Sequence, residues 1–575
     1  MRINKFIIKN VKSFGEETPI SLNPGLNILI GPNAGGKSNL FDVINFSLNY
    51  FFLHTWQVSE HRTNQGVLLS RRLDRTSVYD SPSNYLDKHD RRQSEPQEIR
   101  IRFLIQEEDV KNIQTILDHK DELISLEKDS FESSQLQDAF INFVQDYDVT
   151  NINNKEVEFR VEDNSVSPPE GLDDNESRVT EIVQKYFNYF EMFSLLVQEY
   201  NNNREGEGIL RLYPPLVYFS PYRIPRPDYL VTKLVDSDVF NLRKNYKQDT
   251  SKSDSSTFRL ANYYFALKLR LLNNNFAAFH KDEEVASVNN YMQKLGYKRF
   301  TLREIDAINN KYQACIEKAN GELLEISKAS SGEKEIINMI LGIFAFNVKN
   351  GVVIIDEPDL HLHPLWQNIL LDLFYKLSKD RGIQFMLATH SPIFITRKSI
   401  RNTLRVYATN GESKVVVPPP LEDSEKDLFQ IINVFNNAKI FFADKVILVE
   451  GEVDILVYHS ILHKLQAKFD KTEVIEILDV HGKGNLKKFK KFLDKWQIRS
   501  YRIADKDYKS TDGENLFKLT SGGLEDYFPQ TKEVKRAKFN IDDGLRIAKD
   551  IENDRTPIPG ELEGIFRKII SESAI

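Results

Sequence analysis

The sequence is poor in three features, and each shortage excludes a class of protein. It has one cysteine, Cys315, in 575 residues, which excludes a disulfide framework and a cysteine-based zinc site and fits a reducing cytosol. Its longest nearly apolar run, about 336–346, is too short to span a bilayer. It has no basic excess, since 84 acidic and 77 basic residues give a formal charge of -7. That balance excludes a histone-like protein but leaves room for local patches that bind nucleic acid.

What the sequence does contain is an ordinary globular composition. Hydrophobic residues make up 41% and charged residues 28%, which excludes a mainly disordered or collagen-like chain. The length is enough for about four domains of average size. Lys5 and Lys9 interrupt the N-terminal apolar stretch, so we expect no secretory leader and a cytoplasmic location without a membrane.

A glycine-rich motif follows the strand expected over 26–30. It runs from Gly31 to Ser38 in the form G-x-x-x-x-G-K-S and leads into a helical pattern. In this context, the glycines let backbone N–H groups surround phosphate oxygens, and the helix N-terminus adds positive potential. The alternative is a chance glycine-rich turn, which the strand and helix on either side disfavour. The residues expected to bind the nucleotide are Asn33, Gly36 and Lys37, with Ser38 on Mg²⁺.

Three further motifs follow in the order expected of a nucleotide hydrolase. An apolar strand over 352–355 ends in Asp356 and Glu357, which would bring one acid to Mg²⁺ and the other beside the attacking water. Upstream, Ser331 and Gly332 precede a helix whose N-terminus could bind an anion. Downstream, His390 ends another apolar strand. A lone histidine is usually structural, but this position suits a sensor of the γ-phosphate.

These motifs together resemble the ABC-type ATPase head, most closely in the SMC/RecF-like branch and the OLD (overcoming lysogenisation defect) family. The resemblance implies that Ser331 and Gly332 are the signature, Glu357 the catalytic acid and His390 the switch. In such heads the signature acts on ATP held by a partner, so a homodimer or tetramer is implied. The sequence Ala-Ser-Ser-Gly-Glu departs from the common Leu-Ser-Gly-Gly-Gln signature. Gln106 is a candidate for the Q-loop, whose residue stays open.

The spacing of the motifs indicates insertions in the head. We expect the N-terminal part of the head over 1–225, with an acidic helical insertion over about 106–205. A second helical stretch over 226–320 would make the dimer contact in OLD-like proteins, although plain core packing is the alternative. The rest of the head would cover 321–420, a linker 421–440, and a second α/β domain 441–575.

The last third of the chain places acidic residues at the ends of apolar strands. A strand over 445–449 ends in Glu450, and Asp454 lies at the start of the next helix. A later strand over 500–504 ends in Asp505 and Asp507. The carboxyl ends of parallel strands share one edge of a sheet, and carboxylates without cysteine suit Mg²⁺ or Mn²⁺. Surface acids on turns are the alternative for each residue taken alone.

This arrangement resembles a TOPRIM domain: Glu-Gly after the first strand, Gly-x-Gly-Asn after a middle strand and Asp-x-Asp after a later one. The resemblance implies a metal-dependent nuclease whose metals are held by Glu450, Asp454, Asp505, Asp507 and Glu525. Such nucleases also use a lysine further on. Lys532, Lys535 and Lys538 are candidates, and Lys538 is our choice.

A basic run lies among these acids. Between 483 and 502 it carries six lysines and two arginines against Asp494, while Leu486, Phe489, Leu493 and Trp496 form an apolar helical stripe. The lysines therefore face solvent. They make either a solvated helix face or a track for a phosphate backbone.

An ABC-type head followed by a TOPRIM domain is the layout of the OLD family, and the fold class is α/β. The resemblance implies an ATP-controlled, divalent-metal-dependent DNA endonuclease, with Glu450, Asp505 and Lys538 in catalysis. Family members, including the Gabija nuclease subunit and effectors of retron reverse transcriptases with their msDNA, serve anti-phage defence with partner proteins. One alternative is a non-nuclease ATPase of DNA repair. Another is a sensor subunit that acts only with a partner protein or a structured nucleic acid.

Overall fold

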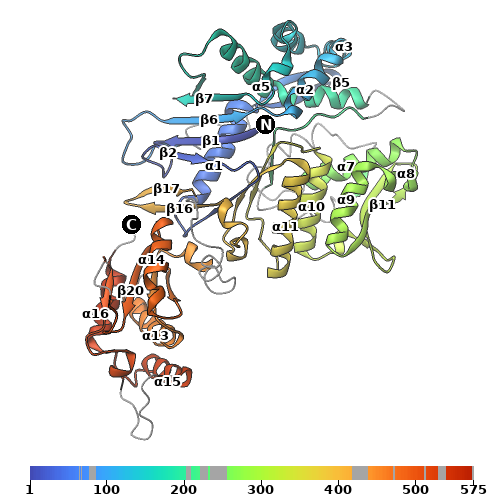
Figure 1. Cartoon of the computed structure of the whole chain (residues 1–575). Helices are drawn as coiled ribbons and strands as arrows, with labels where there is room; N and C mark the ends of the chain where they lie inside the picture. The colour runs from blue at the N-terminus through green and yellow to red at the C-terminus, as the bar shows by residue number, and fades with distance from the viewer. Residues whose placement is uncertain are drawn as a thin grey trace. The chain divides into compact units, whose positions relative to one another are not determined.

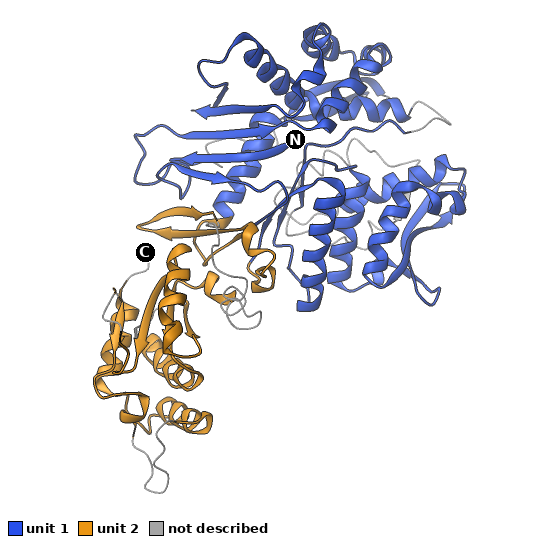
Figure 2. Cartoon of the chain, in the orientation of Figure 1, with its two compact units in different colours: residues 1–28, 38–389 blue, residues 29–37, 390–575 orange. Residues whose placement is uncertain are grey.

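The computed structural model of the chain describes residues 1–63, 65, 68–76, 86–162, 164–202, 209–219, 231–233, 256–417, 438–469, 473–509, 513, 515–528 and 539–572. These residues form two compact units, which Figure 2 colours separately. Unit 1 comprises residues 1–28 and 38–389, and unit 2 comprises residues 29–37 and 390–575. Among the described residues, no helix is long and apolar enough to cross a bilayer.

The first sheet of unit 1 is antiparallel, with strand order β2-β1-β6-β7-β8 (Figure 1). Alternate residues of β6 are buried, as expected for a strand with one face on a core. The strands are β1 (Arg2–Lys9), β2 (Thr18–Ser21), β6 (Glu98–Leu104), β7 (Glu156–Glu162) and β8 (Ser165–Ser167).

Helices and one hairpin accompany this sheet. They are α2 (Glu107–Asp118), α3 (Lys120–Phe131), α4 (Asn142–Val144), α5 (Asp174–Asn202), β4 (Thr55–Arg62) and β5 (Leu68–Thr76). Helix α5 packs against β4 and β7, and α3 packs against α5 and β5. The stretch expected to be a helical insertion over about 106–205 therefore differs in one respect: β7 and β8 lie within it and extend the sheet. Every second residue of β7 is buried, which gives it the period of a strand.

A second module of unit 1 contains both helices and antiparallel strands. Its elements are α7 (Ser256–Leu271), α8 (Phe276–Lys281), α9 (Glu283–Lys294), β10 (Val231–Lys233), β11 (Tyr297–Asp306), β12 (Lys311–Lys318) and β13 (Leu323–Glu325). Among the described residues of the expected helical stretch over 226–320, the helices thus lie between 256 and 294, and strands precede and follow them. Strand β12 is buried along six consecutive residues, a pattern that periodicity alone does not separate from a buried helix segment.

The parallel core of unit 1 leads to the acids Asp356 and Glu357. Strands β9 (Leu216–Phe219), β14 (Val352–Asp356) and β15 (Gln384–Ala388) are parallel neighbours. The first residues of β3 (Leu26–Ile30) lie beside β15. The main-chain N–H of Phe385 donates to the Gly25 carbonyl at 2.8 Å, and the Asn27 side chain donates to the Phe385 carbonyl at 3.2 Å. The helices are α1 (Lys37–Ser47), α10 (Ser331–Ala345), which packs against α7 and α9, and α11 (Pro364–Arg381).

Unit 2 combines a hairpin with a parallel α/β sheet. The hairpin consists of β16 (Thr403–Thr409) and β17 (Glu412–Val416). The sheet has strand order β19-β18-β20-β21, and all its pairs are parallel. Its strands are β18 (Lys445–Val449), β19 (Ile475–Asp479), β20 (Arg499–Ala504) and β21 (Leu516–Lys518).

Four helices cover this sheet. They are α13 (Glu452–Phe469), α14 (Leu486–Lys495), α15 (Ile541–Glu552) and α16 (Gly560–Ser571). Helix α13 packs against α15 and α16, and α14 packs against β18 and β20. The core between sheet and helices includes Ile447, Val449, Tyr501 and Phe566. Because all four strands run the same way, their carboxyl ends meet at one edge.

Candidate functional site

The phosphate-loop motif lies where the sequence places it, between β3 and α1. The Lys37 ammonium is buried and donates to the carbonyl oxygens of Gly31 at 2.8 Å and Pro32 at 2.9 Å. Asn33 and Ser38 are exposed, and Gly36 has φ +105°. The loop thus surrounds its own lysine and holds the ammonium through main-chain oxygens.

Strand β16 fixes the backbone of this loop. A Cβ atom placed on Gly31 would lie 1.9 Å from the carbonyl oxygen of Val406, and one on Gly35 would lie 2.7 Å from it. Gly31 also has φ +146°, a conformation that residues with a side chain rarely adopt. Ser413 of β17 donates to the Gly35 carbonyl at 2.9 Å. The glycines therefore allow close contact with the hairpin.

The acids expected to act in hydrolysis lie at the end of β14 in unit 1. Asp356 is the last residue of the strand, and Glu357 follows with φ +47°. The main-chain N–H of Glu357 donates to the Ala388 carbonyl at 2.9 Å. A left-handed glutamate is strained, and such strain clusters at functional sites.

The expected signature opens α10. Ser330 caps the helix together with Glu333, so Ser331 and Gly332 occupy its first turn. A Cβ atom on Gly332 would lie 2.7 Å from a methyl carbon of Leu362, so the helix start packs directly on the segment after the acids. In that segment Asp359 accepts a hydrogen bond from the Thr389 hydroxyl.

The remaining residues of the ATPase prediction have simple placements. His390 is exposed just after β15. It is grouped with Lys37 in unit 2, whereas Ser38, Ser331, Gly332, Asp356 and Glu357 belong to unit 1. Gln106, the Q-loop candidate, is buried and caps α2 in a capping box with Asp109.

The carboxyl edge of the unit 2 sheet brings two predicted metal ligands together. Glu450 follows β18, and Asp505 follows the neighbouring parallel strand β20. The main-chain N–H of Asp505 donates to Oε1 of Glu450 at 3.1 Å. The two strand ends are thus joined through the side chain of one of the acids.

Asp454 lies in the first turn of α13, beside the same edge. Its Oδ2 accepts a hydrogen bond from the Gly451 N–H at 3.0 Å. Burial, followed by the negative charge of Asp505, raises the pKa of Asp454 to about 7. The three acids therefore share one weakly solvated region, where a cation would relieve their repulsion.

Glu525 lies in this region beside Gly523, which has no side chain. A Cβ atom on Gly523 would lie 2.6 Å from Oε2 of Glu525 and 3.4 Å from both carboxylate oxygens of Asp505. The two carboxylates thus flank one Cα atom. Oε1 of Glu525 also accepts a hydrogen bond from the Phe539 N–H at 3.0 Å.

Asp507 is placed differently. It is exposed and forms an ion pair with Lys483 at the start of the basic segment. Lys532, Lys535 and Lys538 lie outside the described residues. Within the described part of the chain, no group of three or more histidine, cysteine, aspartate or glutamate side chains is already arranged around a metal position.

The chain matches two known families. Residues 1–395 match the family described as AAA ATPase domain. The chain belongs to this family. Residues 441–507 match the family described as Overcoming lysogenization defect protein-like, TOPRIM domain, so this AAA family member carries an OLD-like TOPRIM domain. The expected order of an ATPase head and a TOPRIM domain with a parallel sheet is confirmed.

Curated relatives agree with this composition. The chain is 23% identical over 299 residues to the Old nuclease of Escherichia phage P2, covering 49% of this chain and 50% of that protein. It is 30% identical over 160 residues to the OLD nuclease of Thermus scotoductus, covering 26% and 30%. It is 28% identical over 178 residues to the Vibrio cholerae protein named "Retron Vc95 probable ATPase", covering 28% and 32%. The chain thus spans half or less of each relative.

Among solved structures, a crystal structure of the SmcHead bound to the C-winged helix domain of ScpA is similar at 15% identity and TM-score 0.36. That similarity covers 72% of this chain and 97% of the other.

Two residues near the carboxyl edge of the unit 2 sheet are not among those that the sequence analysis predicts. Tyr458 is buried, and its burial and the charges of Asp454 and Asp505 raise its pKa well above the ordinary value. Glu561 of α16 accepts hydrogen bonds from the Thr520 N–H at 2.9 Å and the Tyr527 hydroxyl at 2.6 Å. The sequence could have indicated Tyr458, because it lies four residues after Asp454 on the same helix. We can identify no such indication for Glu561.

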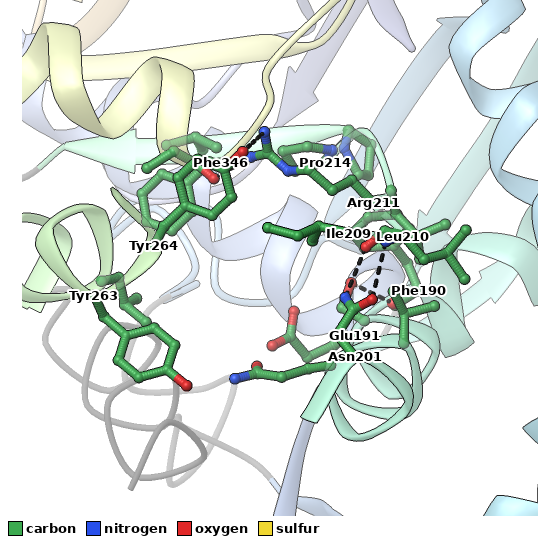
Figure 3. Close-up of a pocket in the computed structure, with 18 of the residues that line it drawn as sticks. Phe190, Glu191, Asn201, Ile209, Leu210, Arg211, Pro214, Tyr263, Tyr264 and Phe346 are labelled. Carbon is green, nitrogen blue, oxygen red and sulfur yellow. Dashed lines mark hydrogen bonds between the residues drawn. The ribbon is translucent and has the colours of Figure 1, made fainter. Parts of the chain in front are cut away.

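An apolar pocket lies in unit 1 (Figure 3). Its walls include Leu210, Tyr263 and Phe346, and Asn201 exchanges hydrogen bonds of 2.8 and 2.9 Å with the Leu210 backbone. None of the described site residues lines it.

Proposed function

We propose that the chain is an ATP-controlled, divalent-metal-dependent DNA endonuclease of the OLD type. The observation that carries this proposal is the pairing of Glu450 and Asp505 on adjacent parallel strand ends. The ATPase and TOPRIM families, and relatives named nucleases, support the same reaction class.

The carboxylate edge fits a hard cation. Glu450, Asp454, Asp505 and Glu525 offer only oxygen ligands, which suit Mg²⁺ or Mn²⁺. The pKa of Asp454 is raised by burial and then by the charge of Asp505, and a bound cation would offset both effects. Asp507 would join this set by releasing Lys483. Bound divalent ions supply an activated water and stabilise the leaving oxygen of a phosphodiester. The protein's part is to hold the carboxylates in place, and Lys538 is proposed to assist at the scissile phosphate.

The phosphate loop fits ATP and Mg²⁺. Lys37 would leave the carbonyls of Gly31 and Pro32 and bind the β and γ phosphates, while Asn33 and Gly36 line the loop. Ser38 and Asp356 would hold Mg²⁺, and Glu357 would orient the attacking water. Ser331 and Gly332 would contact the γ-phosphate on a second copy of the chain, with His390 as the sensor. This arrangement makes a homodimer or tetramer part of the proposal.

The exposed face of α14 is proposed to bind the DNA backbone. Lys487 and Lys491 are exposed, whereas Phe489, Phe492 and Leu493 are buried, so the helix turns its lysines to solvent. Lys483, just before the helix, contacts Asp507 of the carboxylate edge. A phosphate backbone lying along these cations would therefore reach the acids.

The biological setting is proposed to be anti-phage defence in the cytoplasm. One relative is named "Retron Vc95 probable ATPase", and such systems suggest a partner protein or a reverse transcriptase with its msDNA. The chain would then act as the nuclease effector.

Incubating the purified protein with supercoiled plasmid tests the reaction. We expect nicked or linear DNA with Mg²⁺ or Mn²⁺ and none with a chelator. Intact plasmid under every combination of metal and nucleotide would reject the nuclease and favour a non-cleaving ATPase.

A further inference from the structure

A buried arginine in unit 2 contacts the segments that lead into the two strands of the carboxylate edge. Arg405 of β16 is 2% exposed. Its guanidinium donates to the carbonyl oxygens of Gln497 at 3.0 Å, Trp496 at 3.2 Å, Phe441 at 3.4 Å and Ala443 at 3.5 Å. Burial lowers the pKa of Arg405 to about 10, so the group still carries its charge at neutral pH.

The four carbonyls lie just before the two strands that deliver the paired acids. Phe441 and Ala443 precede β18, which leads to Glu450. Trp496 and Gln497 follow the end of α14 and precede β20, which leads to Asp505. The last carbonyls of a helix carry partial negative charge, which a cation stabilises. One guanidinium therefore holds the entry points of both strands.

Aromatic packing makes this junction rigid. The rings of Phe441 and Trp496 meet edge to face at 5.1 Å, and Phe492 lies 6.1 Å from Phe441. All three side chains are buried. A close-packed interior transmits a displacement rather than absorbing it.

The backbone of the same strand touches the nucleotide loop. The residue after Arg405 is Val406, whose carbonyl occupies the space beside Gly31 and Gly35. Lys37 is bonded to the Gly31 carbonyl in this loop. When Lys37 leaves that carbonyl for a phosphate, the loop and β16 cannot move independently.

We propose that Arg405 is a positioning residue that couples nucleotide binding at Gly31–Ser38 to the placement of Glu450 and Asp505. Movement of β16 shifts the guanidinium, and the guanidinium shifts the starts of β18 and β20 together. The role needs arginine, because its planar fork holds several carbonyls at once, whereas lysine offers one point of charge. The proposal rests on the proposed function for its effect on cleavage, but the coupling itself does not require cleavage.

The test compares full-length wild type with Arg405→Lys and with the control Arg401→Lys, an exposed arginine of the same unit. The first measurement is hydrogen exchange of the segments 438–445 and 493–500, with and without a non-hydrolysable ATP analogue. Coupled sites typically change each other's affinity by about 5- to 150-fold. In wild type and in Arg401→Lys, we expect the ATP analogue to change the hydrogen-exchange rates of both segments. In Arg405→Lys, we expect the rates with and without the analogue to differ by less than about twofold.

The second measurement is the ratio of plasmid cleavage rates with and without ATP in Mn²⁺. We expect Arg405→Lys to lose the dependence on ATP while ATP hydrolysis remains. A wild-type chain without nucleotide-dependent exchange in these segments overturns the coupling, even if the variant does not fold. So does an Arg405→Lys protein that responds to ATP as wild type does. If wild type never cuts DNA but its exchange responds to ATP through Arg405, the nuclease proposal fails and the coupling stands.

Discussion

The main-chain N–H of Asp505 and the Oε1 atom of Glu450 are joined by a hydrogen bond of 3.1 Å. It connects the ends of two parallel strands that pair from Lys445↔Arg499 to Leu448↔Arg502. One carboxylate oxygen of Glu450 is therefore engaged by the backbone, which limits the orientations of the other. A fixed carboxylate beside Asp505 is the preorganisation that a cation site requires.

Removal of the Lys37 ammonium is expected to abolish ATP hydrolysis. Losing one preorganised positive group typically costs about 100-fold or more in rate, so Lys37→Ala should hydrolyse ATP at least about 100-fold more slowly. The measurement is phosphate release at saturating ATP. Lys9→Ala, on β1, is the matched control and should hydrolyse ATP as wild type does. A Lys37→Ala protein with wild-type turnover would contradict the assignment of the loop.

The environment of Asp454 is expected to make the stability of the metal-free protein depend on pH. The pKa of Asp454 is raised to about 7 in the folded protein, above its value in the unfolded chain. At a pH between these two pKa values, the unfolded chain therefore binds fewer protons than the folded protein. Stability should therefore fall as the pH rises from about 4 to 7. Asp454→Asn should remove this dependence and raise Tm at pH 8 in a chelator, by about 2–4 °C for each kcal/mol recovered.

The control for this prediction is the addition of Mn²⁺. A bound cation favours the ionised carboxylate, so the slope with pH should shrink or reverse in wild type and change little in Asp454→Asn. An identical pH profile for the two metal-free proteins would show that neither burial nor the charge of Asp505 raises the pKa of Asp454.

Loss of the Glu561 carboxylate charge is expected to loosen the Glu525 loop. Glu561 binds Thr520 and Tyr527 on either side of Gly523, and hydrogen bonds to a charged group are worth about 1.5–3 kcal/mol. Glu561→Gln should lower Tm and raise the Mn²⁺ concentration for half-maximal cleavage, with the rate at saturating Mn²⁺ nearly unchanged.

Glu563→Gln is the matched control, since the Glu563 side chain pairs with Arg567 one turn along α16 at the partly exposed surface of the helix. Such pairs contribute about 0–1 kcal/mol. If both variants have the same Mn²⁺ dependence, Glu561 has no part in metal binding.

Local patterns in the sequence predict the pieces that carry the chemistry. The loop Gly31–Ser38 between a strand and a helix, the strand ending in Asp356 and the amphipathic helix α14 all follow from residue spacing. These features depend on neighbours within a few positions, where periodicity and glycine placement are informative.

Long-range contacts are what the sequence could not supply. Arg405 meets Trp496 and Gln497 across about ninety positions, separations of 91 and 92, and nothing in the local pattern links them. Strand β12, buried on both faces, has no alternation to distinguish it from a helix. The close approach of Glu525 to Asp505 depends on the absence of a side chain at Gly523, which has meaning only in the folded sheet.

The most direct test of the central claim is the initial rate of plasmid cleavage in Mn²⁺ for wild type, Asp505→Asn and the control Glu563→Gln. Asparagine keeps the size of Asp505 and its backbone bond to Glu450 while removing one negative ligand. We expect wild type and Glu563→Gln to cut at the same rate. We expect Asp505→Asn to cut at least about 100-fold more slowly, because the removed charge would act on the reacting phosphate. Equal rates for Asp505→Asn and wild type would contradict a metal-dependent nuclease at this edge.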